Sequence, residues 1–431
     1  MAIHIGIDLG TSGCRAIAVN HKREVLAQNS VSLPPSEREH AGWSVQDPDD
    51  WWLATIEVMG QLISKLSTET VETITVDGTS STLLLSDRYG NPLTAALMYD
   101  DQRAVAAADR ISQRAPISSG AHGPSSSLAK LLWLLENNSD IDKSSGLLAL
   151  HQADWISNRL GGVFGQSDEN NALKMGYDPI KRNWPQWMDS LVLPSDILPA
   201  VSPPGTRYAT LNSQLAVEWG IPKNQRDSIH IHTGTTDSIA ATIAAGINKT
   251  GDAVTSLGTT TALKILSPIP IFSPQDGVYS HRLGESWLVS GASSAGSGIL
   301  LDYFSRKKID ELSQLIEPDI PTGLDYYPLS TAGERFPISD PNLQPRLTPR
   351  PDDDKLFFQG IIEGLTAIEK QGYLKMHKLG APFPNRIVTA GGGADNQKWQ
   401  IIRQQQIGVP VSTATQTEAA YGAAILPALR L

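Results

Sequence analysis

Residues 7–13 read Ile-Asp-Leu-Gly-Thr-Ser-Gly, and residues 256–261 repeat the pattern as Ser-Leu-Gly-Thr-Thr-Thr. In each copy a glycine and several hydroxyl side chains follow a leucine that ends an apolar run. Such a turn exposes backbone N–H groups and hydroxyls, which can hold phosphate oxygens without a lysine. Only the first copy carries an acid, Asp8. The pair predicts two half-molecules that hold one polyphosphate, with Asp8 beside a Mg²⁺ that bridges it.

A single turn of this kind has a simpler interpretation. Gly, Thr and Ser favour tight turns, and aspartate often accepts hydrogen bonds in them. The recurrence in both halves favours the phosphate-binding interpretation. The sequence has neither the Gly-Lys-Ser/Thr of a P-loop nor the His-Arg-Asp of a protein-kinase loop, which excludes both classes.

Length and composition predict a globular protein with two domains. The chain has 431 residues, beyond the size at which one core stops growing, and we expect domains at residues 1–225 and 226–431. Hydrophobic residues make up 40% and charged residues 19%, as in ordinary globular proteins. A net charge of −10 without a long Lys/Arg run argues against a nucleic-acid partner.

Two features bear on location. The single cysteine, Cys14, excludes an intramolecular disulfide and suits a reducing compartment. No secretory segment opens the chain and no apolar run of about 18 residues occurs, so no membrane partner is expected. We expect a cytoplasmic protein, or a chloroplast stromal one if a transit peptide was removed, that is a monomer or homodimer.

Apolar alternation on both sides of the first turn predicts a β-hairpin with the turn at its tip. Asp47-Pro48 predicts the start of a helix over about 51–65. A strand at 73–76 ends in the hydroxyl-rich residues 77–81, at the strand end where open α/β sheets bind ligands. Residues 112–222, dense in Trp, Pro, Asn and Gly, are expected to form irregular additions to the sheet.

The second half continues the alternation of strands and helices. It predicts a strand at 229–236 before an Ala-rich helix, a helix at 356–377, a strand at 386–390 before a glycine run, and a last helix at 418–426. The whole pattern is typical of an α/β fold in which helices flank mixed sheets.

Asp237 ends one of these strands and begins the Ala-rich helix. A carboxylate there can accept a proton from a substrate hydroxyl while the hydroxyl oxygen attacks a γ-phosphate. The same position suits an N-cap of the helix. Position alone leaves both roles open, and one side chain can serve both.

Two further patterns indicate ligand contacts. Gly391–Gly393, followed by Asn396, lets a flat ligand such as adenine approach the backbone, although glycine runs after strands also form plain turns. Asp101 and Arg103 suit a polyol, because the acid accepts from hydroxyls and the arginine donates to them; a surface ion pair is the alternative.

Together these residues resemble the FGGY family of carbohydrate kinases, in the superfamily of actin, hexokinase and Hsp70-type ATPases. The resemblance covers nearly the whole chain and keeps the family's order. It implies two ribonuclease H-like domains, with ATP and sugar in the cleft between them. The matching segments are residues 8–15, 42–48, 100–103, 234–237, 258–260 and 391–393.

The resemblance implies a role for each matching residue. Asp8 would be the Mg²⁺ carboxylate and Asp237 the catalytic base. The cofactors would be ATP and Mg²⁺. ATP contacts would come from Thr11, Ser12, Arg15, Gly258, Thr259, Thr260, Gly391, Gly392, Gly393 and Asn396. Sugar contacts would come from Ser80, Tyr99, Asp101, Arg103 and Asp237.

Departures from the family pattern bear on the sugar. Tyr99 stands where many members have Trp, and Thr79-Ser80 stands where glycerol kinases have Arg-Glu. Residues 77–80 read Asp-Gly-Thr-Ser where xylulokinases usually have Gln-Met-His-Gly. The chain is most similar to the compact cyanobacterial and plant members that are labelled xylulokinase-like and regarded as D-ribulose kinases. We therefore expect phosphorylation of a ketopentose at its terminal hydroxyl, D-ribulose to D-ribulose 5-phosphate, with D-xylulose as the alternative.

A different class of function uses the same superfamily fold. The chain would then be an ATP-driven switch, or a sugar-sensing or leaky ATPase with little kinase activity. Hsp70-type switches carry a separate peptide-binding domain, for which no residues remain here. Sugar binding without a phosphorylated product would identify the sensor.

Overall fold

The structure, a computed structural model, describes residues 2–66, 70–142 and 146–429. The chain forms two compact units: unit 1 comprises Met1–Ala244 and Glu418–Arg430, and unit 2 comprises Ala245–Thr417. The division lies after the predicted boundary at 225/226 because the strand that follows that boundary pairs within the sheet of unit 1.

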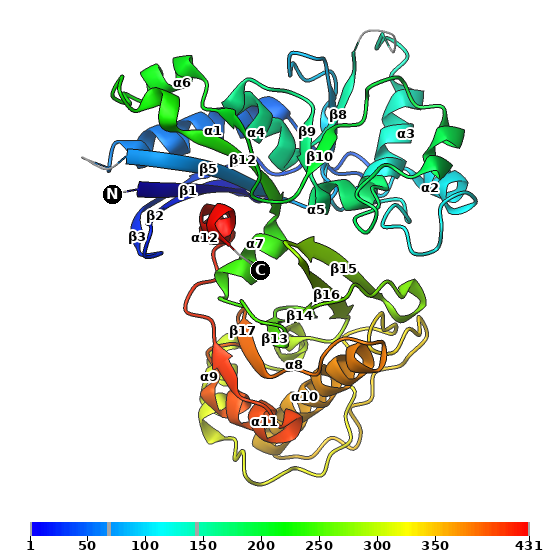
Figure 1. The fold of residues 1–431 in the computed structure, drawn as a ribbon. Coiled ribbons are helices and arrows are strands. Elements are labelled where there is room, and N and C mark those ends of the chain that lie inside the picture. The colour runs from blue at the N-terminus through cyan, green and yellow to red at the C-terminus, as the bar shows by residue number, and fades with distance from the viewer. Residues whose placement is uncertain (1, 67–69, 143–145, 430–431) are drawn as a thin grey trace. The chain divides into compact units, whose positions relative to one another are not determined.

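Unit 1 is built on a six-stranded sheet with the order β11-β12-β5-β1-β2-β3 (Figure 1). β1, β5 and β12 run parallel, whereas β2, β3 and β11 run antiparallel to their neighbours. The carboxyl ends of the three parallel strands therefore meet at one edge of the sheet. The strands are β1 (Ala2–Leu9), β2 (Gly13–Asn20), β3 (Val25–Ser32), β5 (Thr70–Gly78), β11 (Arg207–Thr210) and β12 (His230–Thr236).

Unit 2 contains a second six-stranded sheet, in the order β15-β16-β14-β13-β17-β18. β13, β14 and β16 are antiparallel, and β17 and β18 run parallel to β13. The strands are β13 (Asp252–Leu257), β14 (Thr261–Ser267), β15 (Val278–Leu283), β16 (Ser286–Ser293), β17 (Arg386–Ala390) and β18 (Val411–Thr413).

The two sheets repeat one topology. Strands β3-β2-β1-β5-β12 of unit 1 correspond in order and direction to β16-β14-β13-β17-β18 of unit 2. Three antiparallel strands followed by two parallel ones make each unit ribonuclease H-like, as predicted. Each hydroxyl-rich turn joins the first two strands of its unit, so both occupy the tip of the same hairpin.

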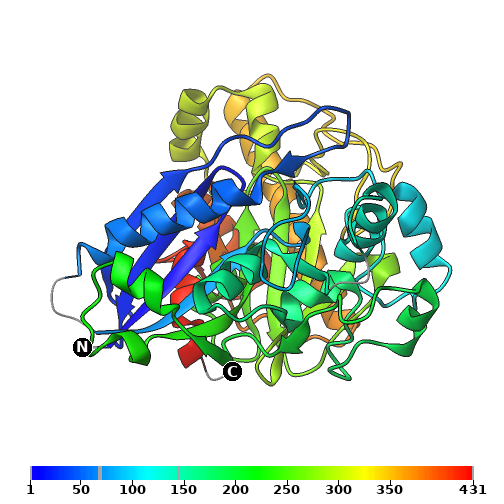
Figure 2. The ribbon, with the colours of Figure 1, turned by 90° about the horizontal axis from the view of Figure 1, so that it is seen from above.

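Helices cover both faces of the sheet of unit 1. α1 (Pro48–Ile63) and α4 (Gln152–Gly161) lie on one face, and α12 (Ala419–Ile425) lies on the other (Figures 1 and 2). The Asp47 carboxylate caps α1 by accepting from the Asp49 N–H at 3.0 Å, as the sequence predicted. α7 (Asp237–Ala244) packs against α12.

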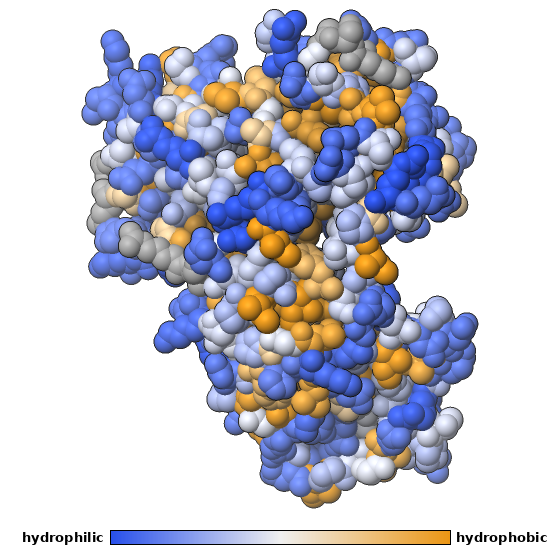
Figure 3. Space-filling view, turned by 45° about the vertical axis from the view of Figure 1, so that its right-hand side comes forward, coloured by the Kyte–Doolittle hydropathy of each residue, from blue (hydrophilic) through white to orange (hydrophobic). Residues whose placement is uncertain are grey.

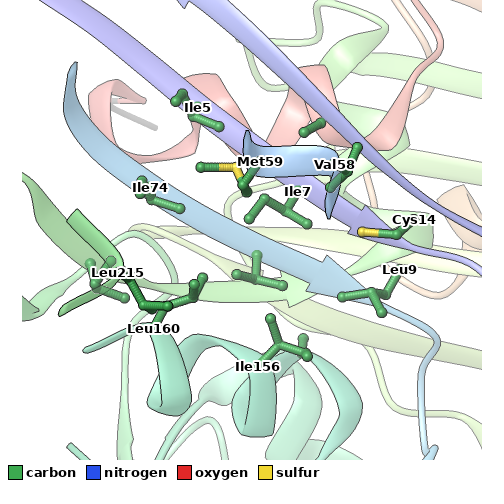
Figure 4. Close-up of a cluster of buried hydrophobic side chains, with 14 of the residues drawn as sticks. Ile5, Ile7, Leu9, Cys14, Val58, Met59, Ile74, Ile156, Leu160 and Leu215 are labelled. Carbon is green, nitrogen blue, oxygen red and sulfur yellow. The ribbon is translucent and has the colours of Figure 1, made fainter. Parts of the chain in front are cut away.

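The core of unit 1 fills the space between its sheet and α1 and α4. Alternate residues of β1, Ile5, Ile7 and Leu9, are fully buried, with Val58 of α1 and Ile156 of α4 close by (Figure 4). Burying such side chains stabilises the fold by about 1.5–3 kcal/mol each. The free thiol of Cys14 is buried in the same cluster.

The other face of β1 meets α12 through glycines. A Cβ on Gly6 would lie 1.8 Å from the carbonyl oxygen of Ala420, and a Cβ on Gly422 would lie 1.8 Å from that of Ala240 on α7. Only glycine permits such close approach of two backbones. The C-terminal helix is thus packed against both the first strand and the helix that begins at Asp237.

Residues 112–222 were predicted to be irregular, and this prediction is wrong in large part. Apolar residues recur at helical spacing in α3, whose first turn is capped by Ser126. The segment contains the helices α3 (Ser127–Asn137), α4, α5 (Glu169–Ala172) and α6 (Ser213–Glu218), and the strands β8 (Leu148–His151), β9 (Gln166–Asp168), β10 (Ala200–Ser202) and β11. α2 (Val105–Ser112) precedes it, and β8 joins a small sheet with β4 (Val45–Gln46), β6 (Leu83–Ser86) and β7 (Ala96–Leu97).

The helix predicted at 356–377 is confirmed, as Asp354–Lys378. Gly408 ends α11 in the left-handed conformation, with φ 86°. The α-helices of unit 2 are α8 (Leu300–Tyr303), α9 (Arg306–Leu315), α10 (Asp354–Lys378) and α11 (Gln397–Ile407).

Hydrophilic side chains cover most of the surface visible in Figure 3. None of the helices in the described ranges has the length and apolarity that a membrane crossing requires.

Candidate active site

A glutamine side chain anchors the first hydroxyl-rich turn by a hydrogen bond to its backbone. The N–H of Gly10 donates to the carbonyl of Gly13 at 3.0 Å, which closes the hairpin tip. The Nε2 of Gln46 donates to the Thr11 carbonyl at 2.8 Å, and its Oε1 accepts from the indole of Trp51 at 2.9 Å. Gln46 belongs to the 42–48 segment of the family resemblance, to which the sequence assigned no role; the structure shows that it anchors this turn.

Three carboxyl groups gather at the edge where the parallel strands end. Asp8 on β1 is paired with Asp77 on β5, which is paired with Thr235 on β12, two residues before Asp237. Asp77 is fully buried, and neither of its oxygens accepts a hydrogen bond from a described residue. Burial raises the pKa of Asp77 well above its usual range, and the charges of Asp8 and Asp237 raise it further. The surroundings of Asp77 therefore favour its protonated form.

Asp8, the partner of Asp77 on the neighbouring strand, is subject to opposing effects. Burial raises the pKa of Asp8, while a hydrogen bond from Asp77 and the nearby Arg15 guanidinium lower it. The Nη1 of Arg15 lies 3.3 Å from Asp8 Oδ2, and Arg15 is about half exposed. Of the predicted phosphate-facing residues, Arg15 contacts the buried carboxylate, and Thr11 and Ser12 lie in the turn that joins the strands of Asp8 and Arg15.

A cavity of about 360 Å³ opens beside this edge. The sequence predicted four of its lining residues: Thr11, Ser80, Tyr99 and Asp237. It missed Gly10 and Thr79, which flank predicted residues, and Lys174. The full lining is Gly10, Thr11, Thr79, Ser80, Tyr99, Lys174 and Asp237. We call this space the acceptor cavity.

Lys174 gave no signal in the sequence, because it lies in the segment predicted to be irregular. Burial lowers the pKa of its ammonium group, and the Asp237 carboxylate opposes that change. The acceptor cavity therefore presents the Asp237 carboxylate and the Lys174 amine to one ligand. Asp237 also begins α7, and its Oδ1 accepts from the Ser238 N–H at 2.5 Å. An N-cap side chain accepts from the N–H two or three residues further on, so this bond does not show the N-cap role, which stays a prediction.

Asp101 and Arg103 do not line the acceptor cavity. The Arg103 Nε lies 3.0 Å from both oxygens of Asp101, and its Nη2 lies 2.7 Å from Oδ2. Asp101 is fully buried and also accepts from the Ser44 N–H at 2.7 Å, while the guanidinium stacks on Trp43 at 3.8 Å. The ion pair of the alternative interpretation is present, in the interior, and the predicted sugar contacts of both residues stay a prediction.

A second cavity, of about 660 Å³, lies within unit 2. It brings together predicted residues from the turn after β13 and the glycine run after β17: Gly258, Thr259, Gly392, Gly393 and Asn396. Thr260 and Gly391 belong to the same turns without lining the cavity. We call this space the nucleotide cavity.

The three consecutive glycines have different tasks. Gly391 has φ +85° and a Cβ there would lie 2.7 Å from the Leu257 oxygen, so this position favours glycine. The N–H of Gly393 donates to Leu257 at 3.1 Å, and a Cβ on Gly393 would meet Trp399 at 2.9 Å. Gly392 faces open space. Its backbone is the one that a flat ligand can approach.

Sequence reasoning missed one wall of the nucleotide cavity. This wall comes from α8, α9 and the turn before them, where polar residues stand in an ordinary amphipathic pattern that carries no ligand signal. Its polar members are Ser297, Arg306, Asp310, Ser313 and Gln314. Asn396 caps α11 by accepting from the Trp399 N–H at 3.0 Å and donates to Ser313 at 3.0 Å, which joins the two walls.

No group of three or more His, Cys, Asp or Glu residues within the described ranges is arranged to hold a metal ion. Mg²⁺ does not need such a group, because it keeps several waters and is usually held by one or two carboxylates plus substrate phosphates. Asp8, a buried hard-oxygen donor beside a phosphate-type turn, fits this mode.

Comparison with known proteins agrees with this geometry. Residues 3–244 match the N-terminal domain, and residues 253–431 the C-terminal domain, of the FGGY family of carbohydrate kinases. The xylulose kinase of Escherichia coli is 27% identical, covering 92% of this chain and 83% of that protein, and that of Bacillus subtilis is 26% identical, covering 98% and 87%.

Solved structures share the fold. The xylulose kinase of Rhodospirillum rubrum superposes with a TM-score of 0.86 at 21% identity, over 99% of this chain and 89% of that one. The glycerol kinase of Plasmodium falciparum with ADP gives 0.85 at 18% identity, with 99% and 89% covered. The chain belongs to the FGGY family of carbohydrate kinases and is an ATP-dependent sugar phosphotransferase.

Proposed function

We propose that this kinase phosphorylates the terminal hydroxyl of a ketopentose. The relatives named xylulose kinase support D-xylulose as the acceptor. D-Ribulose, predicted from the similarity to the compact cyanobacterial and plant members, differs from D-xylulose only in configuration at C3. Both sugars present the same reacting hydroxyl, so one mechanism serves either.

The observation that carries the proposal is the wall of the acceptor cavity, where Asp237 stands with Ser80, Tyr99 and the first phosphate turn. Asp237 accepts the proton of the sugar hydroxyl while that oxygen forms a bond to the γ-phosphorus. The bond from phosphorus to the β,γ-bridging oxygen breaks, and ADP leaves. Lys174 and Ser80 orient the sugar by hydrogen bonding to its other oxygens.

The nucleotide cavity is the proposed site of adenosine, with Gly392 and Asn396 beside the base and Gly258 and Thr259 at the phosphates. Thr11, Ser12 and Arg15 are proposed to hold the transferred phosphate. Asp8 would hold Mg²⁺ directly or through water, and the bound ion would neutralise charge on the phosphate oxygens. The predicted cytoplasmic or stromal location and the monomeric or homodimeric state stay predictions.

ADP release tests the proposal. The assay compares Mg·ATP without sugar and with D-ribulose, D-xylulose, L-ribulose or glycerol at equal concentrations. Strong stimulation by one ketopentose identifies the acceptor. Equal release in every case would leave a sugar-independent ATPase and overturn the proposal.

Replacement of the base tests the mechanism. Asp237→Ala is expected to bind ATP as the wild type does while kcat falls by about 10²- to 10⁴-fold. Asp227→Ala, at an exposed aspartate of the same unit, is the control. Undiminished turnover of the Asp237 variant would contradict the role of this residue.

A further inference from the structure

A buried lysine outside the acceptor cavity joins two of the backbone segments that form it. Lys130 lies on α3 and has no exposed surface. Its Nζ donates to the carbonyl of Ser81 at 2.9 Å and to the carbonyl of Met98 at 2.6 Å. Ser81 follows Ser80, and Met98 precedes Tyr99. Each bond therefore ends one residue from a side chain of the cavity wall.

We propose that Lys130 is a positioning residue that holds Ser80 and Tyr99 in place for the sugar. This inference rests on the proposed function, because it takes the acceptor cavity as the sugar site. Lys130 touches neither the cavity nor the reacting atoms, and it acts through the two carbonyls.

The backbone at Ser81 and the turn after Met98 are both stabilised by the hydrogen bonds of Lys130. Ser81 has φ +71°, a conformation that non-glycine residues adopt only where the surroundings hold them. The carbonyl of Met98 also accepts from the Asp101 N–H at 3.0 Å, which closes the turn that presents Tyr99. Without the Lys130 amine, the strained turn at Ser81 and the turn after Met98 would each lose a hydrogen-bond donor in the interior.

Burial disfavours the charged form of Lys130, but its Nζ keeps N–H donors for both carbonyls whether or not it is charged. Asp101 and Asp100 act on Lys130 so as to favour its charged form, whereas Lys174 and Arg103 oppose it. A buried charge is costly unless it is hydrogen-bonded. A leucine or methionine would fill the same space without that cost, so the donor function of the lysine, rather than its packing, explains the residue.

The test is Lys130→Met, which keeps the chain length and removes the donors. The acceptor KM, measured with D-ribulose and with D-xylulose, is expected to rise about tenfold or more, and the ATP KM to stay within about twofold. Lys370→Met is the matched control, since Lys370 is a half-buried lysine of α10 whose Nζ donates to the Gln406 carbonyl at 2.7 Å.

Hydrogen exchange gives a second readout that does not depend on kinase activity. The amides of Thr82 and Asp101, which bond to the carbonyls of Thr79 and Met98, are expected to exchange about tenfold faster in Lys130→Met. If the wild type phosphorylates neither sugar, the proposed function fails and hydrogen exchange alone decides the positioning role.

Two results would overturn the inference: unchanged exchange in both segments, or a parallel loss for sugar and ATP that follows a lowered melting temperature. If Lys130→Met does not fold, Lys130→Gln replaces it. The glutamine keeps one N–H donor group on a shorter, neutral side chain, and an intermediate rise in the acceptor KM is expected. An acceptor KM equal to that of the wild type in the folded glutamine variant also contradicts the role.

Discussion

At the scale of single residues, Lys130 carries a dependence of stability on pH. Burial lowers its pKa from the ordinary lysine value to about 7. The unfolded chain therefore binds more protons than the folded chain between about pH 7 and the ordinary value. In that window the Lys130 contribution to the free energy of unfolding rises with pH, and it is lost as the pH falls through 7.

We expect the unfolding free energy of the wild type, minus that of Lys130→Met, to increase from pH 7 to pH 9. The increase is expected to be up to about 1.4 kcal/mol per pH unit. Urea unfolding at fixed temperature measures it, with Lys370→Met as the reference substitution. A difference that stays level, or decreases, over this range would contradict the lowered pKa.

Residues of the site could be predicted where local sequence carries the chemistry. Asp8, Asp237 and the glycines of both phosphate turns stand next to hydroxyls at strand ends, a combination that is visible without a structure. Lys130 and Lys174 could not be found in this way. Lys130 lies in an apolar helix and Lys174 in a short 3₁₀ helix, neither with a ligand signal, and only folding brings them near Ser80 and Tyr99.

At the scale of elements, neighbouring glycines in the turn after β17 have different roles. Gly391 adopts a backbone conformation that favours glycine, whereas Gly392 borders the nucleotide cavity. Gly392 meets no neighbouring atom and is not in the left-handed region, so a side chain there fits the fold. It would, however, fill part of the nucleotide cavity. Gly392→Val is therefore expected to raise the ATP KM about tenfold or more, with the acceptor KM and the melting temperature nearly unchanged.

Gly391→Ala is the matched comparison for Gly392→Val. Its backbone has φ +85°, and the added Cβ meets the Leu257 oxygen, so this variant is expected to lose about 1–3 kcal/mol of stability. Steady-state kinetics and thermal unfolding of both variants separate the two effects. An unchanged ATP KM in Gly392→Val would show that this backbone does not border the nucleotide.

Elements with strong local signals were predicted within a few residues, among them α1, α10, β17 and α12. The helices between 112 and 222 were not, because Trp, Pro, Asn and Gly in the loops outweighed the helical spacing of leucines in α3. The small sheet that includes β8 pairs strands distant in sequence, such as Leu83 with His151, which local patterns do not reveal.

At the scale of the whole molecule, five strands of each sheet share one order and direction, and the sequence repeat that predicted this likeness lies at the turns. The turn chemistry is restricted to Gly, Thr and Ser in both units, whereas core positions accept any apolar residues of suitable volume. The chain also returns to unit 1 at its end, since α12 packs on β1. The predicted boundary missed both this return and β12, because strand pairing and helix packing, not order in the sequence, define a unit.

This return makes the last helix a structural part of unit 1, and a substitution at Gly422 tests that assignment. A side chain at Gly422 would collide with the Ala240 carbonyl on α7, the helix that begins at the proposed base Asp237. Gly422→Val is expected to cost about 1–3 kcal/mol of stability and to lower kcat, with the ATP KM unchanged. Hydrogen exchange should quicken in β1 and α7 and stay as in the wild type in α10. Ala419→Ser, on the same helix, is the control, and equal loss of protection in both units would contradict the assignment of α12 to unit 1.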